Sequence, residues 1–133
     1  MKINYLDHVN LRTSRLEELK AFYQKVLGLQ EGPRPDFSFG GAWLYCGDRP
    51  VVHLVAVPER PDPPQTLALE HFAFAAEGLA EFLELLRRHH IAYRVGVAPG
   101  FGIRQVNIYD PDGNRLHVDF GPAENADLSS FQP

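Results

Sequence analysis

Residues 6–11 read LDHVNL, and residues 69–74 read LEHFAF. Both stretches place an acid and a histidine before apolar residues at alternating positions, and the histidines, His8 and His71, lie 63 positions apart (71 − 8). Side chains alternate between the two faces of a strand, so each stretch predicts a β-strand with one buried face. A strand that returns with its histidine indicates an internal repeat, which decides the architecture.

Each of these strands is followed by a helical pattern. Apolar residues recur at three- and four-residue steps over residues 16–26 and again over 79–86, which predicts amphipathic helices. Ser14 and Glu17 have the spacing of a capping box, and Gly28 supplies a left-handed end. The first helix is therefore expected to begin near residue 15 and to end before Gly28.

Short β-rich runs follow both helices. They cover residues 42–46 and 51–57 in the first half and 103–109 and 115–120 in the second, with turn signals between them. Each half thus reads as one strand, one helix and about three strands. The expected fold class is α+β, with two βαβββ modules that form a curved mixed sheet around a central cavity.

The module boundaries follow from composition. The first module is expected over residues 1–57 and the second over 67–121. Residues 58–66 are rich in proline, which excludes a central strand and indicates a stiff linker. Residues 122–133 form a polar tail that we expect to pack loosely.

Composition excludes several functional classes. The 133 residues carry 13 Lys and Arg against 17 Asp and Glu, a net charge of −4, so a surface that follows nucleic-acid phosphates is not expected. A single cysteine, Cys46, excludes an internal disulfide and fits a reducing compartment. No stretch is long and apolar enough for a membrane span or signal peptide. We expect a cytoplasmic protein without nucleic-acid or membrane partners.

Four of the six histidines are predicted to lie within strands, on a face away from the helices. They are His8, His53, His71 and His117. The neutral imidazole is a common ligand of Zn, Fe, Ni and Cu. If the halves are related by a pseudo-twofold axis, His8 corresponds to His71 and His53 to His117, so the four predict a shared metal site. The alternative is that each ring is a hydrogen-bonded core or surface residue, and this alternative is strongest for His53 because its neighbours are apolar.

Polar side chains share the same predicted face in the second half. Gln105, Asn107 and Tyr109 would face a cavity as hydrogen-bonding groups, or would simply be ordinary polar positions of a sheet. Trp43 and Tyr45 would line a substrate wall or pack in the core, and we favour the core.

The chain resembles the vicinal oxygen chelate superfamily, which includes glyoxalase I, extradiol dioxygenases and bleomycin- and fosfomycin-resistance proteins. The segments that carry this resemblance are LDHVNLRT, LEELKAFYQKVLGL, LEHFAFAA and YDPDGNRLHVDF, within about residues 4–121. It implies that His8 and His71 are metal ligands. A position that is usually glutamate is here His117, and Asp119 on the same face could supply the missing carboxylate. Aligning the turns at residues 47 and 113 would instead place His53 opposite Asp119.

The resemblance implies a divalent metal ion (Fe, Mn, Ni, Co or Zn), a small substrate with two neighbouring oxygens, and a homodimer whose modules could be exchanged. We expect a dioxygenase-type enzyme first, because His8 and His71 with Asp119, or with His117 as a third imidazole, approach the ligand set of oxygen-activating iron sites. The alternatives are a glyoxalase-like lyase and a metal-free, drug-sequestering binding protein. Tyr109 and Asp119 are the candidate catalytic residues, and Gln105 and Asn107 the candidate substrate-binding residues.

Overall fold

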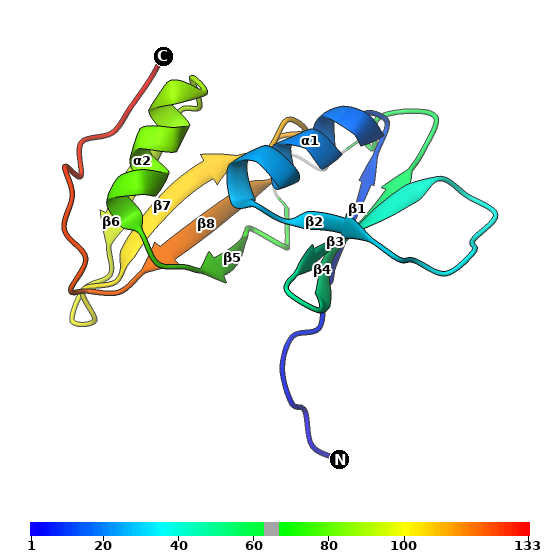
Figure 1. Ribbon diagram of the computed structural model, residues 1–133, viewed down its shortest axis with the longest axis horizontal. Helices are drawn as coiled ribbons and strands as arrows, with labels where there is room; N and C mark the ends of the chain where they lie inside the picture. The colour runs from blue at the N-terminus through cyan, green and yellow to red at the C-terminus, as the bar shows by residue number, and fades with distance from the viewer. Residues whose placement is uncertain (63–66) are drawn as a thin grey trace. The chain divides into compact units, whose positions relative to one another are not determined.

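The computed structural model describes residues 1–62 and 67–133. The chain divides into two compact units, residues 1–64 and 65–133, coloured blue to green and green to red in Figure 1. Of the predicted linker over 58–66, residues 63–66 lie outside the described residues.

The first unit has one helix and a four-stranded mixed sheet. Its strands lie in the order β1-β4-β3-β2, with β1 and β4 parallel and the other neighbours antiparallel. Its elements are β1 (Val9–Thr13), α1 (Leu16–Leu27), β2 (Gln30–Gly32), β3 (Gly41–Cys46) and β4 (Arg49–Ala56).

The second unit repeats this topology. Its strands lie in the order β5-β8-β7-β6, again with one parallel pair, β5 and β8. Its elements are β5 (Phe72–Ala75), α2 (Leu79–Arg88), β6 (Arg94–Val97), β7 (Arg104–Tyr109) and β8 (Arg115–Phe120). The predicted α+β fold of two βαβββ modules is confirmed.

The strand register decides which residues correspond between the units. Asn10 lies beside His53 in the first unit, and Ala73 lies beside His117 in the second. His53 and His117 are therefore equivalent, because Asn10 and Ala73 share the 63-residue offset of the repeat. The turn-based alternative, which placed His53 opposite Asp119, is wrong.

The ends of α1 differ in how well they were predicted. The Arg15 cap position has no side-chain capping bond, and the Arg15 N–H instead bonds the Thr13 hydroxyl at 2.9 Å. The predicted capping box is therefore wrong. Gly28 ends the helix in the left-handed region at φ 69°, and its N–H donates to the Gln24 carbonyl, as predicted.

Apolar side chains between helix and sheet form the core of each unit. Leu19 and Tyr23 of α1 are fully buried, as is Leu83 of α2. In the second unit the Phe82 ring lies 5.7 Å from the Phe120 ring of β8, so α2 covers the face of β8 that carries Phe120. The opposite face of this sheet is left for polar side chains.

The tail is attached to the second unit, so the prediction of loose packing is wrong. The Glu124 carboxylate accepts hydrogen bonds from the Gly78 and Leu79 N–H groups, at 3.0 and 2.6 Å, and so caps the first turn of α2. Tyr93 and Phe131 exchange two backbone hydrogen bonds, and their rings stack. In the described part of the chain, neither helix has the length and apolar character that a membrane crossing requires.

Candidate functional site

One face of the second sheet collects most of the predicted site residues. Apolar side chains of β8 alternate with Arg115, His117 and Asp119, and the register sets Asn107 beside His117 and Gln105 beside Asp119. Because side chains in register lie on the same face of a sheet, this face is polar while the other packs under α2.

His117 is the buried member of this face. It is 6% exposed, and neither ring nitrogen has a hydrogen-bond partner among the described residues. Burial lowers the pKa of the imidazole below its usual 6.5, and the neighbouring His71 lowers the pKa further. The ring is therefore neutral near pH 7, with a lone pair available to a ligand.

Asp119 adds a third buried atom without a partner to the two nitrogens of His117. Its Oδ1 makes no hydrogen bond among the described residues, and it lies 3.8 Å from His117 Nδ1, beyond hydrogen-bond distance. Buried polar atoms normally have partners. Three such atoms on two neighbouring side chains leave hydrogen-bonding and ligating capacity unused, and imidazole nitrogen and carboxylate oxygen are donors that suit a metal ion.

His71 lies against His117. The ring centroids are 4.1 Å apart and the planes differ by 13°. His71 Nδ1 is paired with the Glu70 carboxylate, which favours the tautomer that carries a proton on Nδ1 and leaves the Nε2 lone pair free. Carboxylates commonly orient metal-binding histidines in this way.

The first unit repeats this arrangement. His8 Nδ1 bonds the Asp7 carboxylate at 2.7 Å, and the His8 ring stacks on His53 at 3.8 Å. The acid before each repeated histidine therefore has the same function in both units. The structure brings His8 to His53 and His71 to His117, and it places His8 and His71 directly before their strands rather than within them.

His53 differs from its counterpart His117. Its Nε2 is engaged with the Pro50 carbonyl at 3.0 Å, and its other ring face stacks on Trp43 at 4.0 Å. Burial lowers the pKa of His53, and the nearby His8 lowers the pKa further. Trp43 thus lies on the histidine face, and the expectation that it packs in the core is wrong.

The remaining candidates on the second sheet differ in exposure and in how many hydrogen bonds already hold them. Tyr109 is 60% exposed. Asn107 donates to the Gln105 carbonyl at 3.1 Å and accepts from Arg115 at 2.8 Å, so it is held within the sheet.

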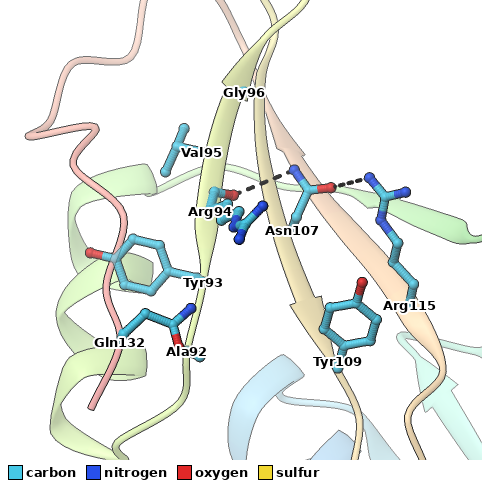
Figure 2. A pocket seen from close by; sticks show the side chains of 9 residues that line it. All are labelled: Ala92, Tyr93, Arg94, Val95, Gly96, Asn107, Tyr109, Arg115 and Gln132. Atoms are coloured by element: carbon cyan, nitrogen blue, oxygen red, sulfur yellow. Dashed lines mark hydrogen bonds between the residues drawn. The ribbon is translucent and has the colours of Figure 1, made fainter.

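A pocket of about 510 Å³ opens over β6 and β7 (Figure 2). Asn107 and Tyr109 line it, as do three residues that the sequence reasoning did not select: Arg94, Arg115 and Gln132. Glu70 was also missed, although the acid before each repeated histidine was a visible signal.

The residues fit a metal in donor chemistry, although no three His, Cys, Asp or Glu side chains within residues 1–62 and 67–133 stand ready as a ligand set. In the second unit the fit rests on the partnerless atoms of His117 and Asp119 and on the oriented ring of His71. In the first unit the His8 ring is oriented by Asp7 in the same way.

Comparison with known proteins gives the family. Residues 5–118 match the sequence profile of the Glyoxalase/Bleomycin resistance protein/Dioxygenase superfamily. A protein of Arabidopsis thaliana named Glyoxylase I 4 is 30% identical over 125 residues, which cover 89% of this chain and 71% of that protein.

Solved structures agree. A glyoxalase family protein from Bacillus anthracis has a TM-score of 0.72 at 27% identity, covering 91% of this chain and 98% of its own. Lactoylglutathione lyase from Agrobacterium tumefaciens shares the fold, with a TM-score of 0.66 at 20% identity over 95% of this chain and 100% of its own. The chain therefore belongs to the glyoxalase, bleomycin resistance protein and dioxygenase superfamily.

Proposed function

We propose that the chain is a divalent-metal-dependent lyase or isomerase of the glyoxalase kind, acting on a small substrate with two neighbouring oxygens. The observation that carries the proposal is the buried, neutral His117, whose two nitrogens lack partners beside His71 and Asp119. The 30% identical relative named Glyoxylase I 4 supports placing a lyase ahead of the oxygenase that ligand types alone favour.

The proposed ligands are imidazoles with a free nitrogen. In the second unit His71 would bind through Nε2, because its Nδ1 is paired with a carboxylate, and His117 would bind through either nitrogen. In the first unit His8 has the same carboxylate pairing at Nδ1 and would also bind through Nε2. His53 ranks last as a ligand, since its Nε2 bonds the Pro50 carbonyl. When bound, a divalent ion would polarise the two substrate oxygens and stabilise negative charge on them.

Asp119 is the proposed general base. Its carboxylate would take a proton from the hydroxyl-bearing carbon beside the substrate carbonyl and return it to the carbonyl carbon, while the hydroxyl proton passes to the former carbonyl oxygen. The net reaction is therefore an isomerisation without an external oxidant. Tyr109 would donate a hydrogen bond to a substrate oxygen, while Gln105 and Asn107 shape the same face.

A dioxygenase is the second candidate. His71, His117 and Asp119 share one sheet face, and two histidines with one carboxylate are the donors of many oxygen-activating iron sites. The two reactions differ in their need for dioxygen, so one pair of measurements separates them.

The metal proposal is tested by elemental analysis of protein purified without a polyhistidine tag. We expect His71→Gln and His117→Gln to lose most of the bound metal. His89→Gln is the matched control, because His89 is an exposed residue at the end of α2. Equal metal content in all three variants, or the absence of metal from the wild type, would contradict the proposal and favour a metal-free binding protein.

The reaction is tested on the metal-loaded protein. Under nitrogen, we expect exchange of the α-proton of a small α-hydroxy ketone with solvent deuterium, followed by NMR, and loss of this exchange in Asp119→Asn. Oxygen uptake with a catechol, without such exchange, would instead support the dioxygenase.

The homodimer implied by the family resemblance also remains a proposal. Light scattering coupled to size-exclusion chromatography tests it, and a mass of 15.0 kDa at all concentrations would contradict it.

A further inference from the structure

The pocket over β6 and β7 has the chemistry of an anion site. Its volume of about 510 Å³ lies within the range of small-molecule sites. Polar lining groups come from Arg94, Asn107, Tyr109, Arg115 and Gln132, and none of the described lining residues is Asp or Glu. Two guanidinium groups without an acid in the wall favour a negatively charged ligand.

Arg115 is held in place before any ligand arrives. One end of its guanidinium pairs with the Glu70 carboxylate, and Nη2 donates to Asn107 at 2.8 Å. Both amide donor contacts of Asn107 go to the carbonyls of Arg94 and Gln105. Asn107 therefore positions Arg115 and has little capacity left to donate to a ligand.

Arg94 carries the uncompensated charge of the pocket. Its guanidinium has neither an ion pair nor a hydrogen bond within the described parts of the chain, and the residue is exposed. Figure 2 shows Arg94 opposite Asn107 and Arg115, with the Tyr109 hydroxyl directed toward the same space. Two guanidinium groups and a phenol hydroxyl that face one space can donate hydrogen bonds to the oxygens of a carboxylate or phosphonate.

The pocket is connected to the candidate metal ligands through one side chain. Glu70 pairs with Arg115 through Oε1 and with His71 through Oε2. The carboxylate that orients His71 therefore also holds the pocket arginine, so an anion bound at Arg115 lies beside the proposed reaction site of the same unit.

We propose that Arg94 and Arg115, with the Tyr109 hydroxyl, bind the carboxylate or phosphonate group of a small anionic substrate. This deepens the proposed function and rests on it for the claim that the anion belongs to the substrate. Binding of the oxyanion itself needs no metal.

The test uses the whole, metal-free, ¹⁵N-labelled protein titrated with methylphosphonate and, in parallel, with acetate. Amide resonances of β6 and β7 are expected to shift. Arg94→Gln should weaken binding roughly 10- to 100-fold, the range for a lost hydrogen bond to a charged group, and Arg94→Lys should recover part of it because the charge remains. A preference for either anion identifies which group the pocket takes.

Arg88→Gln is the matched control, since it removes one positive charge from the surface of the same unit, where Arg88 pairs with Glu84. Unchanged affinity in Arg94→Gln, shifts confined to other strands, or no shift with either anion would overturn the proposal. If the protein binds the anion but holds no metal in the elemental analysis, the anion site is supported and the proposed metal-dependent function is contradicted. If it holds metal but binds neither anion, only the anion site is contradicted.

Discussion

His117 Nδ1 lies 3.8 Å from Asp119 Oδ1, close enough for their charges to interact but too far for a hydrogen bond. The groups that act on the His117 pKa are His71, Asp119 and Arg115; burial lowers it most, His71 and Arg115 lower it further, and only Asp119 raises it. The native state therefore resists protonation of this ring.

Stability of the metal-free protein should fall on acidification. The pKa values of His117 and His53 are lowered in the folded state, so the unfolded chain binds more protons below about pH 6.5. Their contribution is present above that pH and is lost as the pH falls through the folded pKa. Urea unfolding from pH 7.5 to pH 5 checks this. His117→Gln should flatten the profile and His89→Gln should not, and parallel profiles for all three proteins would refute the assignment.

Metal affinity should depend on the acid before each repeated histidine. Glu70→Gln and Asp7→Asn remove the carboxylates that pair with His71 and His8, and loss of such partners typically weakens metal binding about 10- to 100-fold. Competition with a chelator measures the effect. Glu77→Gln changes an exposed acid of the second unit and serves as the control. If Glu77→Gln lowered the metal affinity as much, the effect would come from net charge and not from the carboxylate–histidine pairs. Affinity should also fall on acidification, because protonation of the His117 ring competes with metal binding.

The Glu124 cap should stabilise the second unit. Glu124→Ala leaves the Gly78 and Leu79 N–H groups without their acceptor, which should cost about 0.5–2 kcal/mol of unfolding free energy. Glu124→Gln keeps an acceptor oxygen and should recover much of this. Chemical denaturation followed by circular dichroism gives both values, and an alanine variant as stable as the wild type would show that the cap contributes nothing.

Gly28 should resist substitution for a backbone reason. Its φ is 69°, and a Cβ there would meet no atom within 4 Å, so any cost of Gly28→Ala comes from the left-handed conformation, about 1–2 kcal/mol. Gly121 has equal room without a positive φ. Gly121→Ala should therefore be neutral or slightly stabilising, and similar melting temperatures for the two variants would contradict this.

The fold was predictable because its signals are local and occur twice. Alternation placed His117 and Asp119 on one face of a strand, and the repeat paired His8 with His71. The cap from Glu124 was not predictable, because it depends on a contact between residues 46 positions apart. The same holds for Arg94 and Arg115, which become one pocket wall only when β6 and β8 flank β7.

The prediction for Trp43 was wrong because an aromatic residue in a strand can belong to either face of the sheet. Its neighbours in β3, Ala42 and Leu44, are buried, whereas Trp43 alternates with them and is only half-buried. Hydrophobicity alone assigned Trp43 to the core, but the strand register sets it beside His53, on the face that carries the histidines. Asn107 lies beside His117 in the same way. The two units therefore share a topology but place different side chains, an indole and an amide, next to the corresponding histidines.

The stacking of Trp43 on His53, which in turn stacks on His8, has a practical consequence. Trp43 is the only tryptophan of the chain, so the intrinsic fluorescence of the protein reports on one place. Proton or metal uptake by either imidazole brings positive charge close to the indole ring. The emission of the unlabelled protein is therefore expected to give a direct optical readout of the histidines of the first unit.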